Sequence, residues 1–319
     1  MASLRVKLLA VGLTIVLIAA AVYIVASPKG QTSDKIRIGV LPVIDTLPLY
    51  AAQERGLFQQ AGLNVELVPF NSALERDSAM VAGSIDGYFG DMVNTILLRS
   101  TGQDVKVITI DYHTNEKCRM FGLVASPNNN VTDINSTQGM TVATSSATVT
   151  EYVLDDILAE RNMTGKLTKT EVKAIPIRYQ SLMQNQVQLA IMPEPYVTQA
   201  LQGGAHLVAD DRTINITATV IGMKGSFITG HAAEMKKFLS VYNDTVNSVN
   251  LDPTQYYDVL EKDIHFPKEL EAVYQFPALS NIALPSLQEF QKVQDWMLGK
   301  GIISGSIGYD SVIARELYE

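Results

Sequence analysis

The first part of the chain alternates between short apolar runs and segments whose apolar residues recur at helical spacing. Apolar or alternating runs predict strands, and the amphipathic segments between them predict helices. Strands that alternate with helices favour a parallel sheet with helices on both faces. The predicted strands are 35–41, 65–69, 87–89 and 105–110, and the predicted helices are 46–55, 72–83 and 91–100.

The same pattern restarts after residue 116, which predicts a second α/β lobe. From residue 231 the pattern becomes mainly helical, and we expect this tail to return to the first lobe. The predicted segments are therefore 35–115 for the first lobe, 116–218 for the second, and 219–319 for the return. Strands are expected at 120–125, 140–143, 172–177, 189–192 and 217–223. One helix is expected to start at 148, one to follow the strand that ends at 177, and one to end at 201. Two more helices are expected at 232–250 and 286–299.

Two helix starts carry the main evidence for a ligand site. Asn71–Glu75 and Thr144–Glu151 each follow a predicted strand, and each places a hydroxyl residue three positions before a glutamate. That spacing is typical of a capping box, with Ser72 and Thr148 as the caps. Unpaired N–H groups at such helix starts suit a polar ligand. Two of them in separate lobes indicate lobes that close on one small molecule.

The cleft loops follow from the strand ends, because ligands of open α/β sheets bind beyond the carboxyl ends of the strands. In the first lobe these loops are 45–48, 70–72 and 90–91. In the second lobe they are 144–148 and 193–196.

The N-terminus predicts export. Arg5 and Lys7 precede residues 8–26, a run of nineteen residues without a charge, and a polar linker with Pro and Gly follows at 27–34. Basic residues before such a run are typical of an anchor helix or an export signal. Retention as a membrane anchor and cleavage near Ala26 both stay open. In either case residues after Pro28 are expected outside the cytoplasm.

Composition narrows the function. With 47% hydrophobic and 18% charged residues the chain can form a core, and its net charge of −8 argues against nucleic-acid binding. Cys118 is the single cysteine, and the four histidines have no zinc spacing. We therefore expect no metal, no cofactor and no catalytic residues. Five glycosylation sequons fit an exported surface: Asn130, Asn135, Asn162, Asn215 and Asn243.

Several segments together resemble the solute-binding proteins of ABC importers, in the nitrate, sulfonate and taurine class that also includes binders of thiamine-precursor pyrimidines. The resemblance covers nearly all of the exported part. It is carried by IRIGVLP at 36–42, LPLYAAQERGLF at 47–58, GLNVEL at 62–67, GSIDG at 83–87, FGD at 89–91 and PEPY at 193–196.

This resemblance implies the type II periplasmic-binding-protein fold: two α/β lobes, each with a mainly parallel sheet, and a cleft between them. It implies a monomer that binds a small-molecule solute and delivers it to an ABC permease and its ATPase. The family's contact positions map onto Leu47, Pro48, Asn71, Ser72, Gly90, Asp91, Ser145, Ser146, Thr148 and Glu194, and Tyr152 lies one turn beyond Thr148.

Asp91 and Glu194 bear on the ligand class. Carboxylates at strand ends repel a simple anion and accept strong hydrogen bonds from N–H and O–H groups. A ligand with donors, such as an aminopyrimidine or an amine, therefore fits better than nitrate. Replacing Glu194 by Ala is expected to weaken such a ligand.

Two other functions remain as alternatives. Enzymes of pyrimidine or menaquinone biosynthesis share the implied fold, but this chain lacks the cysteine-rich motif of the pyrimidine-making group. The second alternative is an accessory extracellular sensor.

Overall fold

The computed structural model describes residues 34–319, and residues 35–319 form one compact unit. The apolar run at 8–26 lies outside the described residues. Within residues 34–319, no helix combines the length and the apolar character needed to cross a membrane.

The first lobe is built on a five-stranded sheet in the order β2-β1-β3-β10-β4. Four strands run in one direction and β10 runs against them. Ile38 and Val40 of β1 are fully buried because helices cover both faces. The strands are β1 (Lys35–Val40), β2 (Asn64–Pro69), β3 (Gly87–Gly90), β4 (Val105–His113) and β10 (Thr217–Lys224), and the helices are α2 (Leu47–Glu54), α3 (Leu57–Gln60), α4 (Ala73–Val81) and α5 (Met92–Ser100).

The second lobe repeats this plan with the order β7-β6-β8-β5-β9, in which β5 alone is antiparallel to its neighbours. In each lobe the antiparallel strand is the one by which the chain enters from the other lobe. The strands are β5 (Phe121–Ala125), β6 (Thr141–Thr144), β7 (Thr168–Glu171), β8 (Leu189–Pro193) and β9 (His206–Asp210), and the helices are α6 (Val149–Glu160), α7 (Ile175–Met183) and α8 (Tyr196–Gln202).

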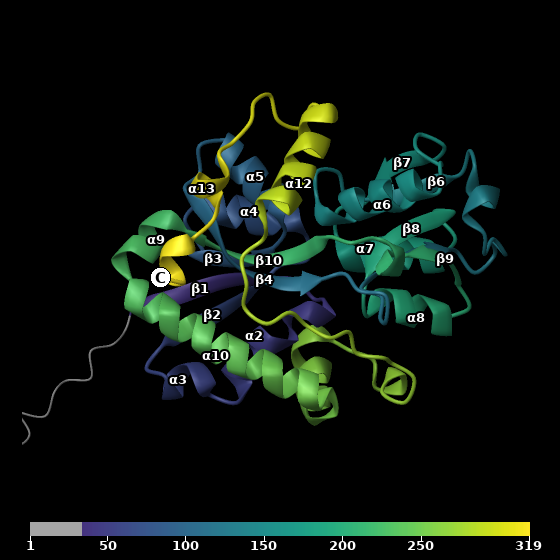
Figure 1. The fold of residues 1–319 in the computed structure, drawn as a ribbon. Helices are drawn as coiled ribbons and strands as arrows, with labels where there is room; N and C mark the ends of the chain where they lie inside the picture. Colours follow the sequence, from purple (N-terminus) through teal and green to yellow (C-terminus); the bar gives the residue numbers. More distant parts are fainter. Residues whose placement is uncertain (1–33) are drawn as a thin grey trace, which may run out of the picture. The chain divides into compact units, whose positions relative to one another are not determined.

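Two connections join the lobes, 114–120 between β4 and β5 and 211–216 between β9 and β10 (Figure 1). They are bonded to each other. The Thr114 backbone N–H donates to the Ile216 carbonyl at 3.0 Å, and the Met120 N–H donates to Asp211 Oδ1 at 3.0 Å. We call this pair of connections, which joins the two sheets, the hinge.

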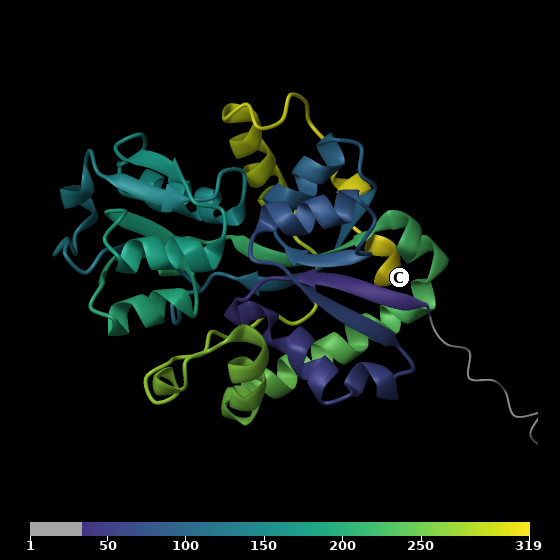
Figure 2. The same ribbon diagram turned by 180° about the vertical axis from the view of Figure 1, so that it is seen from behind.

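The C-terminal part packs on the first lobe. Helix α10 (Ala232–Leu251) contacts α2 and α3, and α12 (Leu287–Gly299) contacts α5 (Figures 1 and 2). The Ala314 N–H donates to the Val107 carbonyl on β4 at 3.0 Å. The remaining helices are α9 (Gly225–Gly230), α11 (Tyr257–Val259) and α13 (Tyr309–Val312).

Two strands differ from the sequence prediction. The strand expected at 172–177 is wrong, because Ile175 begins α7 and Pro176 occupies its first turn. The strand in this region is instead β7, which is largely polar (Thr-Lys-Thr-Glu), and β9 was not predicted. Both are edge strands of the sheet, where burial imposes little apolar pattern.

The boundaries predicted between the segments of the two lobes, at residues 115 and 218, stay predictions.

Candidate functional site

The candidate site is a cavity of about 40 Å³ where the strand ends of the two lobes meet. Leu41 and Asp91 follow β1 and β3, Ser145 follows β6, and Pro193 ends β8. These are the carboxyl ends of the strands, where ligands bind in open α/β sheets. The remaining lining residues are Val43, Asp45, Ala73, Phe89, Phe121, Thr148, Val149, Thr150, Lys173, Ile175, Arg178 and Thr219.

The lobes touch around this cavity through backbone hydrogen bonds. The Ile175 N–H of the second lobe donates to the Asn71 carbonyl at 3.1 Å, and the Ile44 N–H of the first lobe donates to the Glu194 carbonyl at 3.1 Å. One water occupies about 30 Å³ in the liquid. The cavity is therefore of the size of a few waters, and we expect an organic ligand to enter when the lobes move apart.

Asp91 joins the two lobes directly. Its Oδ1 accepts from the Asn94 N–H at 2.8 Å and caps α5, while its Oδ2 accepts from the Val149 N–H of α6 at 3.3 Å. Burial raises the pKa of this carboxyl to about 6, and the positive charge of the nearby Arg76 opposes the rise. Asp91 thus occupies the α6 N-terminus, a position that attracts anions.

Asp45 belongs to a buried acid pair. Thr219 Oγ1 lies 2.9 Å from Asp45 Oδ2 and 2.9 Å from Asp111 Oδ2, and the Tyr242 hydroxyl donates to Asp111 Oδ1. A threonine hydroxyl has one proton to donate, so one of the two carboxyls must itself be protonated. Burial raises the pKa of Asp45 to about 7 and raises that of Asp111 well above its ordinary value. The pair shares a proton.

Asp45 also offers a free acceptor to the cavity. Its Oδ1 is buried and has no hydrogen-bond partner in the structure, and the side chain is 1% exposed. A buried acceptor without a partner is costly. A ligand that donates a hydrogen bond here would remove that cost.

Arg178 provides the opposite charge from the second lobe. It is 1% exposed, Nη1 donates to the Val172 carbonyl at 2.8 Å, and Nε has no partner. Burial lowers the pKa of Arg178 to about 10, so the guanidinium keeps its charge at neutral pH. With Lys173 beside it at the cavity, Arg178 can bind an anionic or carbonyl group.

The two predicted helix caps differ from the expected boxes. Ser72 Oγ accepts from the Glu75 N–H at 3.3 Å, but Glu75 reaches the Asn71 N–H, one residue too early for the box. Thr148 occupies the N-cap position of α6, as predicted, but it makes no side-chain capping bond, because its hydroxyl donates to the Ser145 carbonyl at 2.7 Å. The complete capping box is at Ser286, as its spacing to Glu289 predicts.

Of the predicted contact residues, the structure brings Asp91, Ser145 and Thr148 to the cavity. Others surround it without lining it. Leu47 and Pro48 are buried in the first turn of α2, and Gly90 precedes Asp91. Asn71 makes the interlobe backbone bond, Ser72 caps α4, and Ser146 bonds Glu171 through Oγ at 2.5 Å.

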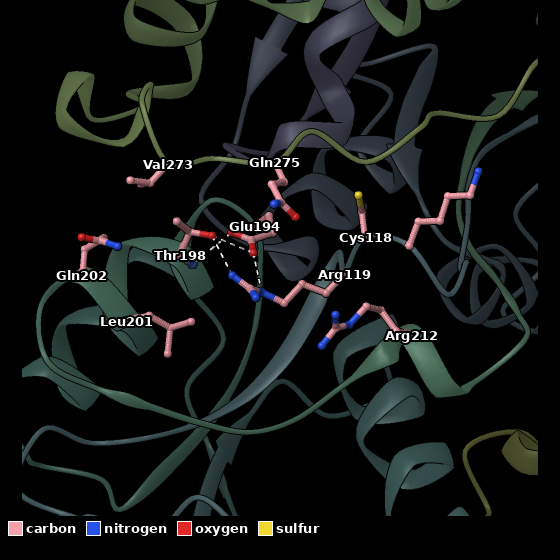
Figure 3. A pocket seen from close by; sticks show the side chains of 10 residues that line it. Cys118, Arg119, Glu194, Thr198, Leu201, Gln202, Arg212, Val273 and Gln275 are labelled. Carbon is pink, nitrogen blue, oxygen red and sulfur yellow. Dashed lines mark hydrogen bonds and ion pairs between the residues drawn. The ribbon is translucent and has the colours of Figure 1, made fainter.

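Tyr152 and Glu194 point elsewhere. Tyr152 packs edge-on against Trp296 with ring centroids 5.2 Å apart, away from this cavity. Glu194 accepts from Arg119 Nε at 2.8 Å and from the Thr198 N–H at 3.0 Å in a separate pocket (Figure 3). Burial raises the pKa of Glu194, and the Arg119 charge opposes that rise.

Sequence reasoning missed Arg178, Lys173 and Thr219, and it included Asp45 only as part of a loop. Asp45 follows a strand end, which is a usable signal. No comparable signal pointed to Arg178, because the strand predicted at 172–177 hides the start of α7, the helix that carries it. Among the described residues 34–319, no group of His, Cys, Asp and Glu side chains could hold a metal ion.

Comparison with known proteins agrees with this architecture. The two lobes with mixed sheets match the periplasmic-binding-protein fold. The structure of the periplasmic aliphatic sulphonate binding protein from Escherichia coli is similar, with a TM-score of 0.74, 16% identity, and coverage of 88% of this chain and 92% of that chain. The alkanesulfonate-binding protein from Xanthomonas axonopodis pv. citri, bound to MOPS, has a TM-score of 0.74, 15% identity, and coverage of 89% and 97%.

The periplasmic nitrate-binding protein from Synechocystis PCC 6803 is also similar, with a TM-score of 0.72, 14% identity, and coverage of 89% of this chain and 87% of that chain. No curated protein sequence matches. The NMT1/THI5 like family model matches residues 44–255, and the chain belongs to that family.

Proposed function

We propose that the chain is the extracytoplasmic solute-binding protein of an ABC importer. It captures a small polar organic solute between its lobes and delivers it to a membrane permease and its ATPase. The observation that carries this proposal is the pair of unpartnered buried groups, Asp45 Oδ1 and Arg178 Nε, on opposite lobes of one cavity. Both would gain a partner from one ligand.

The charges favour a solute with a donor at one end and an anionic group at the other. Asp45 and Asp91 accept from an amine, while Arg178 and the α6 N–H groups bind an oxyanion. A taurine-like aminosulfonate meets both requirements. An aminopyrimidine is the second candidate, because it satisfies the carboxylates and can accept from Arg178.

The similar structures support a binding role. Their names describe binding proteins for sulphonates and nitrate, and periplasmic location is part of two of those names. Nitrate alone would leave Asp45 without a donor. The proposal requires no covalent chemistry, since ligand contacts to both lobes suffice to favour lobe closure.

A thermal-shift screen of residues 35–319 tests the proposal. Taurine is compared with ethanesulfonate, which lacks the amine, with ethanolamine, which lacks the sulfonate, and with an aminopyrimidine and nitrate. A ligand at 100 times its Kd adds about 2.7 kcal/mol, which raises Tm by about 5 °C for a unit of this size. We expect taurine to exceed both truncated analogues.

Variants tie the shift to the site. Asp45→Asn should reduce the taurine shift toward that of ethanesulfonate, and Arg178→Gln should reduce it toward that of ethanolamine. An equal Tm shift with taurine in wild type, Asp45→Asn and Arg178→Gln would contradict the assigned contacts. A wild-type protein whose Tm shifts with none of the compounds would contradict solute binding of this class.

A further inference from the structure

A second pocket, of about 280 Å³, lies at the hinge and is separate from the cleft (Figure 3). Pro193, the last residue of β8, lines the cleft cavity, whereas Glu194, in the turn that follows, lines this pocket. We call it the hinge pocket. Its lining residues are Lys117, Cys118, Arg119, Glu194, Thr198, Leu201, Gln202, Arg212, Val273 and Gln275.

The hinge pocket is cationic in a chain whose net charge is −8. Lys117, Arg119 and Arg212 bring three positive charges to its lining, and two carboxylates pair with them, Glu194 with Arg119 and Asp210 with Arg212, so the cations exceed the carboxylates by one. Arg119 uses Nε for Glu194 and Nη2 for Thr198 Oγ1, both at 2.8 Å. Arg212 uses Nε and Nη2 for Asp210. Each guanidinium has five N–H donors, so both keep donors for a ligand.

Both hinge connections contribute to this lining. Arg119 belongs to the connection 114–120 and Arg212 to the connection 211–216, while Thr198 comes from α8 of the second lobe. Val273 and Gln275 come from the C-terminal segment, and the Gln275 side chain points toward Glu194 (Figure 3). A molecule in the hinge pocket would therefore contact both connections between the lobes, α8 and the C-terminal segment.

We propose that the hinge pocket binds a small organic polyanion carrying two or more negative charges on carboxylate or phosphate groups. Arginine forks match the geometry of both groups, the amides of Gln202 and Gln275 add donors, and Leu201 and Val273 accommodate a short carbon skeleton. The volume suits a molecule of citrate size and is larger than one inorganic phosphate requires. This site is independent of the solute in the cleft.

Cys118 provides the readout, because it is the only cysteine of the chain and lines the hinge pocket. The rate of its alkylation by iodoacetamide, a neutral reagent, is measured in the purified full-length chain as citrate or inorganic phosphate is added. A bound anion shields the thiol and disfavours its thiolate form, so alkylation should slow along a saturable curve. We expect half-saturation by citrate near or below about 1 mM. A sodium chloride series at matched ionic strength corrects for screening.

Matched variants locate the effect. Arg212→Gln removes one lining charge and should weaken citrate about tenfold, the loss expected for one charge-assisted contact. Lys117→Gln should weaken it in the same direction. Arg161→Gln makes the same charge change on the exposed end of α6, away from the pocket, and should leave the affinity unchanged.

The comparison of citrate with inorganic phosphate also distinguishes a carboxylate ligand from a phosphate ligand. Saturable protection by citrate alone assigns a polycarboxylate, and protection by phosphate as well assigns the phosphate class. Absence of saturable protection by either anion overturns the proposal. Equal weakening in Arg212→Gln and Arg161→Gln overturns it too, because the effect would then be general screening. None of these results depends on the cleft ligand.

Discussion

The Asp91 carboxylate of one lobe accepts a hydrogen bond from the Val149 N–H of the other lobe, at 3.3 Å. Val149 is the first residue of α6, so the carboxylate lies at the positive end of that helix. An oxyanion entering the cleft would compete with Asp91 for the same N–H group. One of the contacts between the lobes is therefore also one that an oxyanion would displace.

Asp91 should act on stability through its cap. Asp91→Ala removes the acceptor of the Asn94 N–H and should cost about 1 kcal/mol of unfolding free energy, whereas Asn caps helices about as well as Asp. Urea denaturation at pH 7 measures both variants. Equal stability of Asp91→Ala and Asp91→Asn would contradict the capping role.

The shared proton of Asp45 and Asp111 should make stability fall with rising pH. The raised pKa of Asp45, about 7 against an ordinary value of 3.8, means that the folded chain holds a proton that the unfolded chain releases above about pH 4. This contribution is fully present below pH 3.8 and is lost as the pH rises toward 7. The slope is at most about 1.4 kcal/mol per pH unit.

Replacement by an amide removes that slope. Asp45→Asn keeps the shape and cannot ionise, so its unfolding free energy should depend less on pH between 4 and 7, and it should gain on wild type as the pH rises. Denaturation curves at half-unit intervals give the difference. A constant difference across this range would show that Asp45 does not titrate there.

The fold follows from the sequence wherever a strand is buried. β8 carries an apolar run that is buried throughout, and β1 alternates polar and apolar residues, with its isoleucines buried. The edge strands β7 and β9 lack that constraint and left little signal. The strand predicted at 172–177 does not form, because Pro176 suits the first turn of a helix and lies in the first turn of α7.

The site was predictable only as far as strand ends define it. Asp91, Ser145 and Thr148 follow strands, and the rule for open sheets places them at the cleft. The contact of Arg178 with the same cavity depends on how the two lobes meet, which no local pattern reports. For Glu194 the missing fact was Arg119, which comes from the hinge connection 75 residues earlier.

An ion-pair cluster at the side of the cleft should hold the lobes together. Lys300, the residue that caps the C-terminus of α12, contacts Glu151 Oε1 at 2.6 Å and Asp155 Oδ2 at 2.8 Å on α6 of the second lobe. Lys292 adds a contact to Asp156 at 2.8 Å. Because α12 packs against α5 of the first lobe, these pairs cross between the lobes. Partly exposed pairs contribute when they form a network and weaken with salt.

Loss of Lys300 should favour separated lobes. Lys300→Gln is expected to increase the radius of gyration of residues 35–319 in small-angle X-ray scattering at low salt, and added salt should move wild type toward the same value. Lys166→Gln makes the same charge change at an exposed lysine outside this cluster and should leave the radius unchanged. Identical radii for Lys300→Gln and wild type would show that the cluster does not hold the lobes.

Replacing Glu194 separates a structural role from a ligand role. Its carboxylate is 1% exposed and accepts from Arg119 and from both the N–H and the hydroxyl of Thr198. Glu194→Ala leaves the partly buried Arg119 without its ionic partner and should cost about 3 kcal/mol, while Glu194→Gln keeps acceptor capacity and should cost less.

The affinity of the Glu194→Ala variant for the cleft solute distinguishes the structural role from the ligand role. Since the Glu194 side chain lies in the hinge pocket, the folded Ala variant should bind the cleft solute as wild type does in calorimetry, with its loss confined to stability. A tenfold weaker solute affinity with unchanged stability would restore the ligand role that its position after β8 suggested.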